Sequence, residues 1–179
     1  ICCNMDNRNG ILGISGADER FMREALVLAA EAAEAGEVPV GAVVVRHGEI
    51  VGRGRNRRES GGGAAAHAEI EAITEACRAL GGWRLSGCEL YVTLEPCPMC
   101  AGAVVNARLD RVVYGAHDAR GGALGGLFDL TSYPLGCRPL ILGGVLESEC
   151  TALLRDFFAA RRKTDGKPRR LLREFYSVH

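Results

Sequence analysis

The fold is decided by one stretch, residues 89–107, which reads ELYVTLEPCPMCAGAVVNA. Its first part, 89–94, carries the β-branched and aromatic residues that favour a strand. A helix is predicted after the turn, because Pro98 suits a first helical position, where its missing N–H costs nothing. Cys97 and Cys100 stand at the start of that helix, and their spacing lets both sulfur atoms face the same point.

Outward from this stretch, strands alternate with helices along the chain. The spacing of apolar residues predicts helices at 18–35, 64–80 and 147–163, and strands at 40–45, 50–55, 111–115 and 139–142. In the last helix we expect at least one of Phe157 and Phe158 to pack in the core. The glycine-rich loop at 116–133 is long enough to indicate a functional segment. The alternation predicts a layered α/β fold, and the hairpin formed by the first two strands makes its sheet mixed.

Length and composition predict one globular domain. The chain has 179 residues, a hydrophobic content of 47% and a formal net charge of zero, so no global charge indicates a partner. We expect a disordered extension over 1–17, the folded domain over 18–165 and a basic tail over 166–179. No signal peptide or membrane span is visible in the sequence. The eight cysteines do not indicate a disulfide scaffold in a chain this long, so we expect a cytoplasmic protein with free thiols at Cys77, Cys88, Cys137 and Cys150.

A second motif, His67-Ala68-Glu69, lies about thirty residues before Cys97. One histidine and two cysteines suit zinc, and three protein ligands leave the fourth tetrahedral position open for water. Glu69 follows the histidine closely enough to move the protons of that water. The alternative is a closed structural site with Cys88 as a fourth ligand, although no second C-x-x-C or H-x₃-H motif accompanies it.

Together, the two motifs match the H-x-E and P-C-x-x-C signature of zinc-dependent nucleobase deaminases. Further stretches narrow the resemblance to one family; they are 37–43, 65–70, 91–103, 111–116 and 153–158. Over about residues 21–163 the chain resembles the bacterial tRNA-specific adenosine deaminases, the TadA family of the cytidine-deaminase-like superfamily. It departs from the family pattern at Ala65-Ala66, where many members carry threonine or serine, and at His117, where arginine is frequent.

The resemblance implies a fold, a reaction and a set of site residues. The implied fold is a three-layer α/β/α structure with a five-stranded mixed sheet, assembled as a homodimer. The implied reaction converts the wobble adenosine of a tRNA anticodon to inosine. His67, Cys97 and Cys100 match the ligands of one Zn²⁺ per subunit, and Glu69 matches the proton shuttle. The implied substrate contacts are Val40, Asn56, Ala68, Asp118, Phe158, Arg161 and Arg162.

Three other functions remain open at this point. The closest rival is the same chemistry on a free base or nucleoside, as in a guanine or cytidine deaminase. The other two are a zinc-binding module without catalysis and a nucleic-acid-binding module without chemistry. An RNA substrate is favoured because a base in an anticodon loop is cheap to extrude and because phosphates attract cations. The cations concerned are the basic end of the last helix and the arginines at positions 53, 55, 57, 58 and 120.

Overall fold

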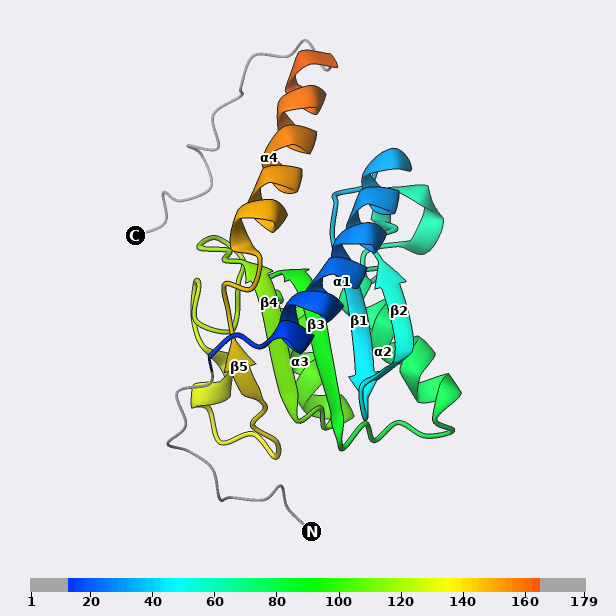
Figure 1. Cartoon of the computed structure of the whole chain (residues 1–179), viewed down its shortest axis with the longest axis vertical. Coiled ribbons are helices and arrows are strands. Elements are labelled where there is room, and N and C mark those ends of the chain that lie inside the picture. Colours follow the sequence, from blue (N-terminus) through cyan, green and yellow to red (C-terminus); the bar gives the residue numbers. More distant parts are fainter. Residues whose placement is uncertain (1–12, 165–179) are drawn as a thin grey trace, which may run out of the picture.

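The computed structural model of the protein describes residues 13–164, which are built on a five-stranded mixed sheet (Figure 1). The strands lie in the order β2-β1-β3-β4-β5. β1 runs antiparallel to β2 and β3, whereas β4 runs parallel to both of its neighbours, β3 and β5. Their bounds are Gly41–Arg46 for β1, Glu49–Arg55 for β2, Cys88–Leu94 for β3, Arg111–Ala116 for β4 and Leu140–Leu142 for β5. The five-stranded mixed sheet is therefore confirmed.

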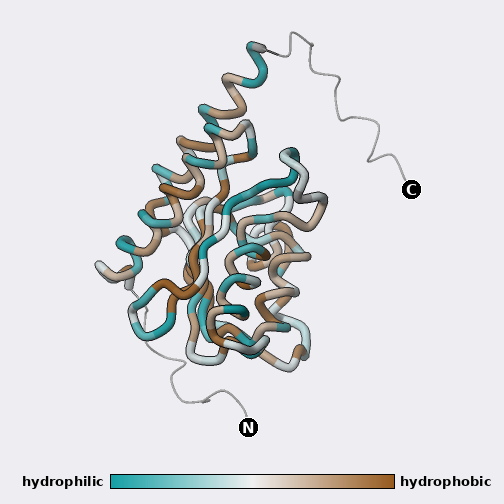
Figure 2. Tube along the Cα trace, turned by 90° about the vertical axis from the view of Figure 1, so that its right-hand side faces the viewer, coloured by the Kyte–Doolittle hydropathy of each residue, from teal (hydrophilic) through white to brown (hydrophobic). Residues whose placement is uncertain are grey.

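Helices cover both faces of the sheet. They are α1 (Gly16–Glu34), α2 (Ala68–Ala79), α3 (Pro98–Ala107) and α4 (Glu147–Thr164), with short helical turns at Arg58–Gly62 and Leu130–Ser132. α1 and α4 lie on one face, and α2 and α3 lie on the other (Figure 1). Figure 2, turned by 90°, shows a helical layer on each side of the sheet. Successive strand residues enter opposite cores, so that Val44 packs on the side of α2 and Val43 on the side of α1. The fold is the predicted three-layer α/β/α structure.

One edge of the sheet collects the chain segments that carry the sequence motifs. β3 and β4 are parallel and end together, since Leu94 lies opposite Ala116. β1 is antiparallel to both neighbours, so its first residue, Gly41, lies at the same edge and faces Arg55, the last residue of β2. We call this edge, marked by these four residues, the site edge. The turn that leads to Cys97 starts here, directly after β3.

Two helices begin elsewhere than predicted. α1 begins at Gly16 and not at Asp18, because Ser15 and Asp18 form a capping box in which each side chain accepts the backbone N–H of the other. α2 begins at Ala68, so the predicted helical start at 64–67 is wrong. The intrinsic helix propensity of the alanines there is overridden by a bond from the N–H of Arg57 to the carbonyl oxygen of Ala66.

The expectation that Phe157 or Phe158 packs in the core is also wrong. Phe157 is half-buried and Phe158 is 42% exposed, and their rings contact each other with centroids 5.4 Å apart. In the first half of α4, Cys150 and Leu154 pack against the sheet. The second half rises past the site edge, where there is no strand for it to pack on (Figure 1).

The predicted tail at 166–179 lies outside the described residues, as does most of the predicted extension at 1–17. Within 13–164, every helix is too short or too polar to cross a bilayer.

Candidate metal centre and active site

The two sequence motifs meet at the site edge, each at the N-terminus of a helix. His67 is the N-cap residue of α2, Cys97 is the N-cap residue of α3, and Pro98 follows Cys97 at the start of α3 as predicted. Gly54 of β2 allows α2 to approach closely, because a Cβ atom there would lie 2.1 Å from the carbonyl oxygen of Ala68. The close packing of α2 on the sheet therefore brings the histidine to the end of β3, where the cysteines lie.

The geometry of the three predicted ligands fits zinc. Nδ1 of His67 lies 3.7 Å from Sγ of Cys97 and 3.5 Å from Sγ of Cys100. Tetrahedral zinc, with Zn–S of about 2.3 Å and Zn–N of about 2.0 Å, needs N···S separations of about 3.5 Å. Within 13–164, these side chains form the one group of three or more potential ligands. His67, Cys97 and Cys100 could therefore hold one zinc ion with three protein ligands.

The three ligand side chains form hydrogen bonds with one another, and these bonds shift their pKa values in opposite directions. A hydrogen bond with Cys100 lowers the pKa of the Cys97 thiol to about 4. The same bond and burial raise the pKa of Cys100, and a hydrogen bond with Cys97 raises the pKa of His67. A metal ion that binds between these side chains displaces the protons that they share. The N-terminus of α3 adds positive partial charge that favours thiolate.

Glu69 lies beside the ligands, in the first turn of α2, and is buried. Its burial raises the pKa of the carboxyl group, which also forms a hydrogen bond with Cys100. A buried carboxyl group next to a metal site has the position and the environment of a general acid or base.

Cys88 is not a fourth ligand, so the closed structural site is ruled out. It begins β3, whereas Cys97 follows the end of that strand, and six strand steps of about 3.3 Å alone separate its two ends by about 20 Å. Its charged neighbours are Arg46 and Asp110. The predicted free thiols are confirmed at Cys77, Cys88 and Cys150, and the thiol of Cys137 lies 3.7 Å from the carbonyl oxygen of Leu109.

The similarity of the chain to known proteins identifies its family. Residues 15–116 match the family model of the cytidine and deoxycytidylate deaminase zinc-binding region. The tRNA-specific adenosine deaminase of Bacillus subtilis (strain 168) is 50% identical over 158 residues, which cover 88% of this chain and 98% of that protein. This chain belongs to the tRNA-specific adenosine deaminase family.

Solved structures agree with this membership. One, from a study of A-to-I editing by tRNA deaminases at the wobble position of transfer RNA, is 46% identical with a TM-score of 0.72, and the match covers 75% of this chain and 99% of that one. The guanine deaminase of Bacillus subtilis is 42% identical with a TM-score of 0.54, but that match covers 58% of this chain and 66% of the guanine deaminase. The tRNA deaminase is therefore matched over almost its whole length and the guanine deaminase over about two thirds.

In this member of the tRNA-specific adenosine deaminase family, a buried carboxylate holds the predicted substrate contact Asn56. The backbone N–H of Asn56 donates to Val40 at 3.0 Å, and its Nδ2 lies 3.5 Å from the carboxylate of Glu37. Glu37 also accepts the backbone N–H groups of Glu59 at 3.1 Å and Ser60 at 2.6 Å. Burial opposes the ionisation of Glu37, but these backbone bonds outweigh it and lower its pKa. The carboxylate of Glu37 therefore holds Asn56, Glu59 and Ser60 in fixed positions relative to one another.

Asp118, the predicted contact in the loop after β4, is held by a second buried carboxylate. Its backbone N–H donates to Glu95 at 3.0 Å, and its own Oδ1 accepts the N–H of Arg120 at 3.0 Å. The side chain of Asp118 is half-buried. The loop therefore has a fixed shape at this position.

The remaining predicted contacts differ in exposure. Val40 and Ala68 are buried, with 8% and 0% exposure, and can only line the floor of a site. Phe158, Arg161 and Arg162 are exposed on the second half of α4. The structure therefore groups the zinc ligands and Glu69 tightly, whereas α4 carries its three residues out beyond the sheet.

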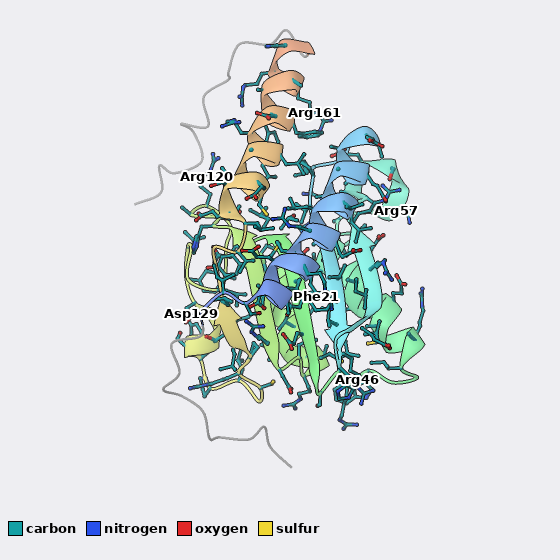
Figure 3. All side chains as sticks on the ribbon, viewed as in Figure 1. Phe21, Arg46, Arg57, Arg120, Asp129 and Arg161 are labelled. Carbon is teal, nitrogen blue, oxygen red and sulfur yellow. The ribbon has the colours of Figure 1, made fainter. Side chains whose placement is uncertain are left out.

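Arginines surround the site edge. Figure 3 shows Arg57, Arg120 and Arg161 at that end of the molecule and Arg46 at the opposite end. Arg57 lies 3.8 Å from Glu71, and Arg55 lies 3.9 Å from Glu31, and each pair has one exposed and one half-buried side chain. Solvent-accessible pairs of this length contribute little to stability and leave the cations available to phosphate.

Sequence reasoning assigned no role to Glu37 or Glu95, although both lie inside the stretches that match the family. Both are buried, with 0% and 2% exposure. One signal could have found them: each glutamate lies within two residues of a proline at one end of an apolar strand segment, where a buried carboxyl group needs hydrogen-bond donors. Apart from the side-chain amide of Asn56, the donors are main-chain groups, which cannot be recognised in the sequence.

Proposed function

We propose that the protein is a zinc-dependent hydrolase that converts the wobble adenosine of a tRNA anticodon to inosine. One observation carries the proposal: a three-ligand zinc site with a buried Glu69 beside it occurs in a chain that matches 98% of a tRNA-specific adenosine deaminase at 50% identity.

The residues of the site divide the chemistry between them. His67, Cys97 and Cys100 hold the metal, which, when bound, lowers the pKa of a water molecule so that it is nucleophilic near neutral pH. Glu69 takes a proton from the attacking water and gives it to the adjacent ring nitrogen of adenine. A second proton transfer through Glu69 releases the amine as ammonia. One C–O bond forms and one C–N bond breaks, so adenosine and water become inosine and ammonia.

Substrate recognition follows from the residues around the site edge. Asn56 offers its amide to the extruded nucleoside, above a floor formed by Val40 and Ala68. Asp118 contacts the backbone of the anticodon loop, and α4 closes over the loop with Phe158, Arg161 and Arg162. A loop base is unpaired, so extruding it costs less than extruding a base from a duplex.

The proposal includes a homodimer that acts in the cytoplasm. The support for a dimer is an apolar hollow of about 410 Å³ beside α3, lined by Trp83, Val105, Asn106, Arg108, Leu135 and Gly136. Trp83 and Leu135 are 53% and 37% exposed there, as expected for a surface that a second copy covers. The free thiols of Cys77, Cys88 and Cys150 fit a reducing compartment. Light scattering coupled to size exclusion tests the dimer, and a monomer at micromolar concentration contradicts it.

The test of the reaction is substrate competition. The purified zinc-loaded protein is incubated with an anticodon stem-loop that carries adenosine at the wobble position, and separately with free adenosine, guanine and cytidine. Chromatography with mass detection should show inosine in the stem-loop and no change in the free compounds. Turnover of guanine or cytidine beside an inert stem-loop overturns the proposal and favours a free-base or nucleoside deaminase.

A further inference from the structure

We propose that Glu95 is a positioning residue that shapes the loop 117–126, and with it Asp118, for binding the RNA substrate. The inference deepens the proposed function and rests on it. It assigns to a buried side chain, which has no contact with the reacting atoms, the task of setting one wall of the RNA site.

Both carboxylate oxygens of Glu95 are occupied by main-chain donors of one loop. Oε2 accepts the N–H of Asp118 at 3.0 Å, and Oε1 accepts those of Leu124 at 3.0 Å and Gly126 at 2.8 Å. The side chain of Glu95 has 0% exposure. Bonds from N–H groups to a buried carboxylate are stronger than neutral ones, and each donor would be costly to leave unpaired. The loop therefore takes its shape from this carboxylate.

The loop needs glycine at positions 122 and 126, because the carboxyl group of Glu95 lies too close to both for a side chain. A Cβ atom at Gly122 would lie 2.3 Å from the carboxyl carbon of Glu95, and both oxygens would be 2.5 Å away. A Cβ atom at Gly126 would lie 2.4 Å from Oε2 of Glu95 and 2.4 Å from the carbonyl oxygen of Asp118. Any side chain at either position displaces the loop or the carboxylate. The glycine-rich composition of this segment is thus explained by the cradle it forms around Glu95.

The same residue ties the loop to the metal centre. Glu95 lies two residues before Cys97, and its N–H donates to Ala116 at 2.9 Å, at the end of β4. The next residue, Pro96, accepts the N–H of Ala123 at 2.9 Å. The loop and the turn that carries the zinc ligand are therefore one hydrogen-bonded unit. The distance from Asp118 to the zinc site is set by this unit and not by the loop alone.

Two variants disturb the cradle in independent ways. Glu95→Gln replaces one acceptor oxygen by an amide group that confronts an N–H donor, and Gly126→Ala leaves the carboxylate intact but forces the loop away from it. The matched controls are Glu34→Gln, at an exposed position, and Gly82→Ala, where an added Cβ meets nothing within 4 Å.

The readout is affinity for RNA and not turnover alone. The ligand is an anticodon stem-loop that carries inosine at the wobble position, which the enzyme cannot deaminate further, and Kd is measured by fluorescence anisotropy. Both cradle variants should raise Kd by about tenfold or more, with one zinc per subunit retained, and both controls should match wild type. An unchanged Kd in folded variants overturns the inference, and so does loss of zinc, which would make Glu95 a support of the metal site.

A double-mutant cycle separates positioning from a general loss of stability. Asp118→Ala should weaken stem-loop binding in the wild-type background. In the Glu95→Gln background it should weaken binding little further, because Glu95→Gln already misplaces Asp118. Additive losses contradict the inference. If Glu95→Gln does not fold, the same cycle is run with Gly126→Ala. A wild-type protein that fails to deaminate the stem-loop refutes the proposed function, which is a different outcome from normal binding by the variants.

Discussion

Replacement of Gly54 by alanine should shift α2 and weaken zinc binding, although the residue lies on a strand and contacts no ligand. The added Cβ would lie 2.1 Å from the carbonyl oxygen of Ala68 and 2.5 Å from the backbone nitrogen of Ala72. A carbon atom normally stays about 3.3 Å from a carbonyl oxygen, so the first turn of α2 has to move by about 1 Å. His67 caps this turn and moves with it.

The expected magnitudes follow from this shift. Metal–ligand distances tolerate changes of about 0.2 Å, so a histidine displaced by about 1 Å loses optimal geometry. Losing the support of one ligand typically costs about 10-fold to 100-fold in metal affinity. Overpacking of this kind also costs about 1–3 kcal/mol of stability, which lowers Tm by about 5 °C in a domain of this size.

Gly52 provides the matched control. A Cβ atom there would lie 2.3 Å from the carbonyl oxygen of Ala72 and 2.7 Å from the nitrogen of Ala76, one turn further from the N-cap. Gly52→Ala should therefore lower Tm by a similar amount but weaken zinc binding much less. Zinc affinity is measured by competition with a chromophoric chelator, and Tm by calorimetry. Equal zinc affinity in Gly54→Ala and Gly52→Ala would falsify the idea that the strand spacing positions the histidine.

Three further predictions concern single carboxylates. Glu69→Gln should keep its zinc and lose about 10²-fold to 10⁴-fold in the rate of inosine formation, and a full rate contradicts its role as proton shuttle. Burial opposes the ionisation of Asp18, but hydrogen bonds, chiefly from Arg111, outweigh it and lower its pKa below 3.8. The stabilisation is then present at neutral pH and is lost as pH falls through the folded pKa. In urea unfolding, Asp18→Asn should be less stable than wild type by on the order of 3 kcal/mol at pH 7, and the gap should narrow below pH 3.8; a gap independent of pH contradicts this. Glu37→Gln should raise KM for the stem-loop about tenfold by releasing Asn56, with kcat less affected, and an unchanged KM refutes that link.

Periodicity predicts most of the elements, since strands and helices that bury one face carry the pattern in their own residues. The prediction fails where contacts between residues distant in the sequence decide where a helix begins or which of its residues are buried. The alanines at 64–66 favour a helix in isolation, but the main-chain bond of Ala66 to Arg57 holds them in a turn. Phe157 and Phe158 have the spacing of core residues, but the sheet ends before their helix does. Neither the bond to Arg57 nor the end of the sheet can be read from the residues of the helix concerned.

The site likewise has a part that the sequence predicts and a part that it does not. His67, Glu69, Cys97 and Cys100 are predictable because zinc chemistry demands particular side chains at short spacings. Apart from the side-chain amide of Asn56, the partners of Glu37 and Glu95 are main-chain N–H groups 22 to 31 residues away in the chain. Any residue except proline supplies such a donor, so the sequence of the donating loop gives no sign of it.

The two halves of α4 differ in local stability. Its first half shares the core of the domain, so opening it exposes Cys150 and Leu154 and costs much of the global unfolding energy. Its second half lies beyond the sheet, where Phe158 is 42% exposed, so opening it exposes less new apolar surface and costs less. Amide exchange should therefore be slow up to about Leu154 and fast beyond it. Binding of an RNA loop to this basic end of α4 should therefore slow amide exchange there more than in the first half of the helix.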